Sequence, residues 1–322
     1  MSDSNGLLIL KKFCKAMKNQ DNCETASTYI SWALENMSTC FDMNVVEKYK
    51  ENPDFMELCI LCSILSSIGS ETHIEYVSRC IRDFQIRSGK DYITEDEVFT
   101  SSIMSFIYSI FAIANTPDDP VVFENSFKNI IVALDLQGCR LELGTYSKET
   151  ILKTLNLPDN VIHIASDMYY SIWTFQIAHE IYHILCGEEK SISQEIEADK
   201  FGYSTLIKLI GRQKKGELPT ECSCFYEYTY LAPIVLFEYF KLIDLWKELC
   251  GVKISKDESH PSNERRADFI FSWFDELVPD DFDTSEGNEI LNNCLEAIDS
   301  VVENIKIKVD AGKLDSIILK SK

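Results

Sequence analysis

Apolar residues recur at three- and four-residue spacing over most of the chain, and this spacing predicts a mainly α-helical protein. In the first 115 residues it predicts a succession of helices, at residues 7–18, 25–37, 45–67, 74–86 and 96–114. The sequence T-P-D-D-P at residues 116–120 combines prolines, which end helices, with aspartates, which favour turns. It predicts the end of an N-terminal helical region, which we place at residues 1–115.

Two short runs beyond this turn, at residues 129–134 and 161–164, are rich in isoleucine and valine and are predicted to be strands. Further helices are predicted at residues 221–249, 261–277 and 290–309, with an acidic linker at 279–287. Together these elements predict an α+β fold that is mainly α with a small β-sheet. We divide it into the N-terminal helical region, a core at residues 121–278 and a C-terminal helical segment at residues 288–322.

The longest uncharged stretch, residues 98–117, approaches the length of a membrane span. Four serines and two threonines interrupt this stretch, and acidic residues flank both of its ends. The basic flank that orients a membrane helix is therefore missing. We expect a buried helix of a globular domain and no membrane insertion.

The segment around residues 169–186 has the pattern of a helix that is buried on one side. Its apolar positions recur at helical spacing, at Trp173, Ile177, Ile181 and Ile184. Gly187 follows as a natural C-terminal stop. This predicted helix carries the sequence H-E-I-Y-H at residues 179–183, which has the form H-E-x-x-H.

The H-E-x-x-H sequence predicts a zinc site, because residues four apart lie on the same face of a helix. His179 and His183 can therefore direct both imidazoles at one tetrahedral Zn²⁺. Glu180 directly follows the first histidine, so its carboxylate is expected beside the metal as the general base that activates water. The cofactor expected is one Zn²⁺ per chain.

A third zinc ligand is expected on the following helix. Ser191 and Gln194 have the S-x-x-Q form of a capping box, which predicts that this helix begins there. Glu195 lies in its first turns and could face back toward the two histidines, and Asp199 follows on the same face. Glu197 is the competing ligand, but it points about 200° away from Glu195 around the helix.

These motifs resemble those of the gluzincin metallopeptidases of the HtpX and CAAX-prenyl-protease type. In that family, H-E-x-x-H is followed by an acidic E-x-x-A-D motif, matched here by the sequence E-I-E-A-D at residues 195–199, and by H-P-x-x-x-x-R, matched from His260 to Arg266. The resemblance covers roughly residues 160–275. Among these peptidases, the soluble Lit-type phage-exclusion enzymes are the most similar, because they share the three motifs without membrane spans.

The resemblance implies a role for each matching residue. Glu195 would be the third zinc ligand, and Asp199 would accept the spare imidazole N–H of a ligand histidine. His260 and Arg266 would line the catalytic cleft. His260 is the first candidate donor to the oxyanion that forms during peptide hydrolysis, followed by Tyr228, Tyr230 and Arg266. We name Glu180 and His260 as the expected catalytic residues.

The sequence thus predicts a zinc-dependent endopeptidase with a zincin-like core that acts on an intracellular protein or peptide substrate. The Lit-type resemblance further implies a latent enzyme of antiviral defence that is switched on during phage infection. A strand at residues 161–164 would offer its edge to an extended substrate. The alternative is a catalytically idle, zinc-bearing scaffold that binds a partner protein through its N-terminal helices. For the enzyme, the same helices are a candidate surface for a regulatory protein partner. The intact Glu180 favours the enzyme, since a scaffold needs no base.

Charge and cysteine content narrow the setting. The 322 residues include 31 Lys and Arg against 52 Asp and Glu, a net charge of −21, so nucleic acid is not an expected partner. The 12 cysteines are scattered through predicted helices, and the polar start of the chain shows no secretory signal. We therefore expect reduced thiols and a cytoplasmic protein. Cys59 and Cys62 lie in an apolar run and are not expected to form a zinc knuckle.

Overall fold

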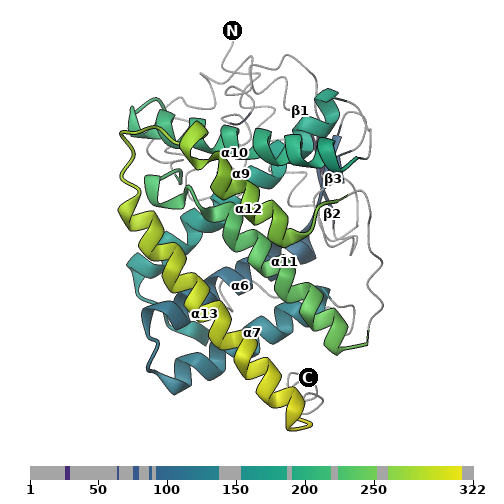
Figure 1. The fold of residues 1–322 in the computed structure, drawn as a ribbon, viewed down its shortest axis with the longest axis vertical. Coiled ribbons are helices and arrows are strands. Elements are labelled where there is room, and N and C mark those ends of the chain that lie inside the picture. Colours follow the sequence, from purple (N-terminus) through teal and green to yellow (C-terminus); the bar gives the residue numbers. More distant parts are fainter. Residues whose placement is uncertain are drawn as a thin grey trace. The chain divides into compact units, whose positions relative to one another are not determined.

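The computed structural model describes residues 26–29, 64, 75–79, 87–88, 92–137, 154–186, 191–218, 224–251 and 260–313. Most of these residues are helical (Figure 1), which confirms the prediction of a mainly α-helical chain. Among them, no helix combines the length and the apolar character that a membrane span requires. The predicted helix at residues 7–18 and the Cys59–Cys62 pair lie outside the described residues.

The chain divides into two compact units, each formed from two separate stretches. Unit 1 comprises Met1–Glu97 and Trp173–Glu227, and unit 2 comprises Val98–Ile172 and Tyr228–Lys322. These units cut across the three consecutive regions predicted from the sequence. The turn at residues 116–120 does separate two helices, but both of them belong mainly to unit 2.

The described secondary-structure elements of unit 2 are all helices. Its elements are α6 (Glu97–Asn115, of which Glu97 belongs to unit 1), α7 (Pro120–Gln137), the first half of α9 (Asp159–Cys186), the 3₁₀ turn η3 (Glu227–Thr229), α11 (Ala232–Leu249), α12 (Asn263–Leu277) and α13 (Ser285–Asp310). Helix α11 contacts α7, α12 and α13 (Figure 1), and most of its residues are buried. Burial of apolar side chains around α11 therefore holds these helices together.

A buried hydrogen bond joins α7 to α11. The indole Nε1–H of Trp246 donates to Asp135 Oδ1 at 2.8 Å, and both side chains are about 1% exposed. Two aromatic pairs also pack α6 against α11: Phe99 stacks on Phe240, and Phe106 lies tilted against Tyr239. A carboxylate at this depth needs its donor, because a charged acceptor without a partner is costly inside a protein.

We therefore expect Trp246→Phe, which removes the indole N–H but keeps an aromatic ring, to lower the free energy of unfolding by at least about 1.5–3 kcal/mol. Denaturant titration would measure the change. Phe271→Leu is the matched control, because Phe271 is 51% exposed on α12 of the same unit, and we expect it to change stability by less than about 0.5 kcal/mol. Equal effects of the two substitutions would contradict the role of the hydrogen bond.

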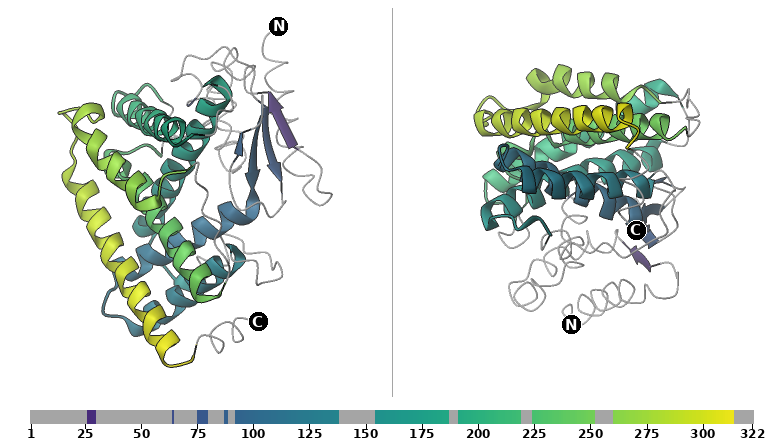
Figure 2. Two further views of the ribbon diagram at one scale, coloured as in Figure 1. Left: turned by 45° about the vertical axis from the view of Figure 1, so that its right-hand side comes forward. Right: turned by 90° about the horizontal axis from the view of Figure 1, so that it is seen from below.

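Unit 1 contains a small sheet as well as helices. The strands are β1 (Ala26–Tyr29), β2 (Glu75–Arg79), β3 (Arg87–Ser88) and β4 (Tyr92–Asp96), in the order β1-β2-β4-β3 (Figure 2). Strand β2 pairs in parallel with β4, and the other two pairings are antiparallel. The second half of α9 and helix α10 (Ile192–Lys214) also belong to this unit.

Both strands predicted from the sequence are wrong, because residues 129–134 lie within α7 and residues 161–164 within α9. Residues 130–134 are all buried, so this part of α7 is apolar all round and shows no polar face to reveal its helical period. The predicted substrate-binding edge at residues 161–164 is therefore absent.

The helices predicted at residues 25–37 and 74–86 are also wrong, because residues 26–29 and 75–79 are strands. The helix predicted at residues 96–114 is confirmed as α6. Of the later helices, α12 and α13 match their predictions closely, while the helix predicted from residue 221 begins only at Ala232.

Candidate metal centre

Helix α9 presents two histidines one turn apart. His179 is 7% exposed and His183 is half-buried, and their ring centroids lie 4.8 Å apart. The helix continues through both residues to Cys186, so the i, i+4 spacing puts them on one face. The Nε2 atoms of the two rings are 3.1 Å apart. Both imidazoles therefore point at the same small region.

Helix α10 brings two acids to these histidines. Ser191 caps the helix, since its hydroxyl accepts the N–H of Gln194 at 3.3 Å. Glu195, in the first turn, is 5% exposed, and Asp199, one turn later, is fully buried. Glu197 lies on another face of α10 and is exposed.

His179, His183 and Glu195 bring one ligand atom each to within 4.8 Å of one another, and we call these three residues the ligand triangle. His179 Nε2 lies 3.4 Å from Glu195 Oε2, and His183 Nε2 lies 3.5 Å from Glu195 Oε1. Zinc–ligand bonds of about 2.0–2.2 Å in a tetrahedron would hold such atoms about 3.3–3.6 Å apart. With the 3.1 Å between the two Nε2 atoms, the three contacts are close to this spacing, and the two histidines face different oxygens of the Glu195 carboxylate. The residues therefore fit one zinc ion in geometry and in ligand type.

Asp199 fixes the orientation of His179. The Nδ1–H of His179 donates to Asp199 Oδ1 at 2.9 Å, which leaves Nε2 facing the triangle. Carboxylates commonly hold ligand histidines in this way. Burial alone would lower the pKa of His179, but hydrogen bonds to Asp199 and Glu195 and the charges of Asp199 and Glu180 raise it to about 9. The surrounding negative charge thus favours a cation at Nε2, either a proton or a metal ion.

Glu180 adjoins the triangle on α9. Its side chain is half-buried, and its charge contributes to the raised pKa of His179. Glu180 is not part of the three-residue ligand group. This charge interaction with His179 is consistent with the predicted base role of Glu180, which stays a prediction.

The other predicted site residues lie in unit 2. His260 is exposed just before α12, and the guanidinium of Arg266 lies over the ring of Phe237 at 4.6 Å. The Tyr228 hydroxyl donates to Asp167 at 2.5 Å, and that of Tyr230 donates to Asn288 at 2.8 Å. The two tyrosines therefore use their protons within unit 2, and the cleft roles of His260 and Arg266 stay predictions.

Sequence reasoning did not single out one buried residue on the same face of α10. Gly202 lies on the same face of α10 as Glu195 and Asp199 and packs against Phe175 of α9. The signal was present in the sequence, because Ala198 and Gly202 are small residues four apart on a helix next to the metal motif.

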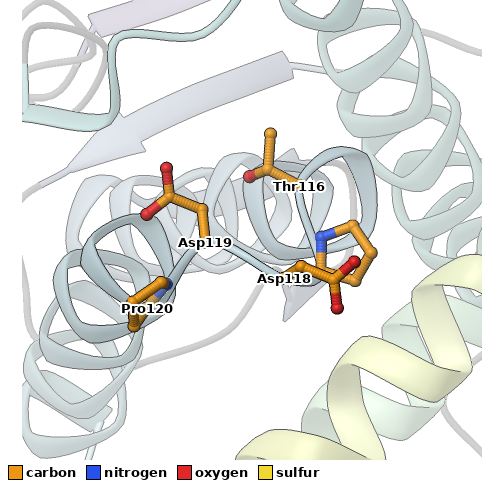
Figure 3. A pocket seen from close by; sticks show the side chains of 5 residues that line it. Thr116, Asp118, Asp119 and Pro120 are labelled. Atoms are coloured by element: carbon orange, nitrogen blue, oxygen red, sulfur yellow. The ribbon is translucent and has the colours of Figure 1, made fainter.

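Unit 2 has a surface hollow that is formed by a turn between two helices. It is lined by Thr116, Pro117, Asp118, Asp119 and Pro120, and the two carboxylates point away from one another (Figure 3). Asp119 Oδ1 accepts the N–H groups of Val121 and Val122 at 2.8 and 3.1 Å and so caps α7. The hollow is thus formed by a helix-capping turn, and none of its lining residues belongs to the ligand triangle.

Comparisons with known protein families, with curated proteins and with solved structures found no match to this chain.

The choice of third ligand can be tested by removing one charge at a time. We expect Glu195→Gln to weaken zinc binding by at least the roughly 10–100-fold that loss of a supporting partner costs a metal site. Glu197→Gln makes the same change on the exposed face of α10 and should leave the affinity unchanged. Competition with a chromophoric chelator would measure both. The reverse order of effects would move the ligand to Glu197.

Proposed function

We propose that this chain is a zinc-dependent endopeptidase that hydrolyses peptide bonds of a protein substrate, with Glu180 as the general base. The observation that carries the proposal is the ligand triangle, in which the contacts between His179, His183 and the carboxylate of Glu195 measure 3.1, 3.4 and 3.5 Å, close to the spacing of ligand atoms around one tetrahedral zinc ion. Three protein ligands leave a fourth position open, which is typical of catalytic zinc sites and not of structural ones.

Each residue of the centre has a distinct part in the proposed reaction. His179, His183 and Glu195 would hold the ion, and Asp199 keeps the Nε2 atom of His179 directed at it. When bound, zinc acidifies water and polarises a carbonyl oxygen. Glu180 takes the proton of the attacking water and then delivers it to the leaving amine. A nearly buried centre also shields these proton transfers from bulk water.

We assign the chain, also as a proposal, to a zincin-like fold of the HtpX gluzincin type. Three motifs support this assignment by their order: H-E-x-x-H in α9, the acidic motif of residues 195–199 in α10, and H-P-x-x-x-x-R at the start of α12. A latent peptidase of phage defence, located in the cytoplasm, is the form of this function that the Lit-type resemblance favours.

The competing function is a zinc-bearing scaffold that binds a partner protein and performs no chemistry. Both functions need the ligand triangle, so loss of the metal cannot separate them. Loss of the base can separate the two functions, because only the peptidase requires Glu180.

The proposed function is tested by mapping newly formed protein termini in cells that express either the wild type or Glu180→Gln, with and without phage challenge. The challenge is needed because a latent enzyme would be silent without its trigger. We expect at least one cleavage that depends on intact Glu180. Identical terminus profiles in all four samples, with any cellular phenotype retained by Glu180→Gln, would favour the scaffold and overturn the peptidase.

A further inference from the structure

We infer that Gly202 is a positioning residue of the metal centre, because it lets α10 approach the turn of α9 that carries His179. Four buried residues recur at helical spacing along one face of α10: Glu195, Ala198, Asp199 and Gly202. The two acids of this face contact His179. The two small residues of the same face allow the backbones of neighbouring helices to come close together.

The contact at Gly202 leaves no room for a side chain. A Cβ atom added there would lie 2.8 Å from the backbone oxygen of Phe175 and 3.1 and 3.2 Å from two of its ring carbons. The first distance is shorter than real Cβ contacts, and it involves backbone, which cannot rotate away. Phe175 is itself 1% exposed, so its ring is held by packing.

This contact lies one helical turn from the chemistry on each helix. In α9 the carbonyl of residue 175 accepts the N–H of residue 179, so Gly202 touches the turn that carries His179. In α10, Gly202 follows Asp199 by three residues, on the same face. To accommodate a Cβ atom at position 202, the two helices would have to separate until this contact widens from 2.8 Å to an ordinary 3.4 Å. A displacement of this size exceeds the deviation of about 0.5 Å within which the residues of a functional site must be held.

Helix propensity does not explain a glycine at this position. Alanine is a better helix former than glycine in a helix interior, so propensity alone predicts that Gly202→Ala would stabilise α10. The close approach to Phe175 predicts the opposite, together with displacement of Asp199 and Glu195 from His179.

The inference rests on the proposed metal centre, and it can be tested by the affinity for zinc alone and by the visible spectrum of Co²⁺ bound in its place. We expect Gly202→Ala to bind zinc about 10–100-fold more weakly than the wild type and to show an altered Co²⁺ spectrum. Gly287→Ala is the matched control. A Cβ there would lie 2.6 Å from the ring of Tyr230, in unit 2, so it should lower stability and leave both metal readouts unchanged.

The outcomes separate the positioning role from the metal centre itself. A wild type that binds no stoichiometric zinc would overturn the centre. A wild type that binds zinc, with Gly202→Ala matching its affinity and spectrum, would overturn only the positioning role. Equal losses of affinity in Gly202→Ala and Gly287→Ala would also overturn it, by tracing the effect to general stability.

A second variant keeps the test decisive if Gly202→Ala does not fold. Phe175→Leu removes the ring contacts at 3.1 and 3.2 Å and keeps the backbone contact at 2.8 Å. Gly202→Ala in this background should still bind zinc more weakly than Phe175→Leu alone. Equal affinities of these two variants would overturn the inference.

Discussion

Glu180→Gln is expected to fold normally, to bind one zinc per chain and to lose peptide-bond hydrolysis by at least about 10²–10⁴-fold. Glutamine keeps the size and shape of glutamate but cannot accept a proton. Glu180 is half-buried and lies outside the ligand triangle, so the substitution should spare both the fold and the metal. The measurement is the rate at which Glu180-dependent protein termini form in phage-challenged cells that express each variant, with zinc content determined on the purified proteins.

The control for Glu180→Gln is Glu197→Gln, which removes the same charge from an exposed position on α10 and should cleave at the wild-type rate. Zinc content is determined in every sample, so that loss of metal is not mistaken for loss of the base. Wild-type cleavage by Glu180→Gln would show that another group performs the proton transfer. Cleavage lost together with zinc would instead make Glu180 part of the metal site.

The grouping of His179, His183, Glu195 and Asp199 was accessible to sequence reasoning because these residues lie within two consecutive helices. Helical spacing alone predicts that His179 and His183 share a face, and that Glu195 and Asp199 share another. The cap at Ser191 sets the start of α10 and so decides which acid faces the histidines. The structure brings these four side chains together through contacts between these two consecutive helices.

The sheet was not accessible in the same way. Strand β1 at residues 26–29 pairs with β2 at residues 75–79, so its conformation depends on a partner far away in the sequence. The strand predicted at residues 129–134 was wrong for the opposite reason. A short apolar run has no polar positions from which to separate a buried strand from a buried helix, and the long α7 in which it lies decides the outcome.

Gly202 illustrates a third kind of limit. Its spacing from Asp199 is visible in the sequence, but the reason for a glycine there is the carbonyl of Phe175 on another helix. A rule about residue types can suggest a close approach, whereas only the structure identifies which backbone is approached and which ligand depends on it.

His183→Ala is expected to reduce the zinc content from about one per chain to near none after dialysis against a weak chelator. The variant leaves two protein ligands, too few for a stable zinc site, and it avoids His179, whose loss would deprive buried Asp199 of its hydrogen-bond partner.

Zinc bound only by the folded protein stabilises it by about 4 kcal/mol at a free concentration 1,000 times the Kd. The wild type should therefore unfold at a higher temperature with zinc than with chelator, and His183→Ala should unfold at the same temperature in both. His163→Ala is the matched control, because His163 is an exposed histidine of the same helix, and it should behave like the wild type. Stoichiometric zinc retained by His179→Ala/His183→Ala would place the metal elsewhere in the chain and remove the basis for both the peptidase and the scaffold.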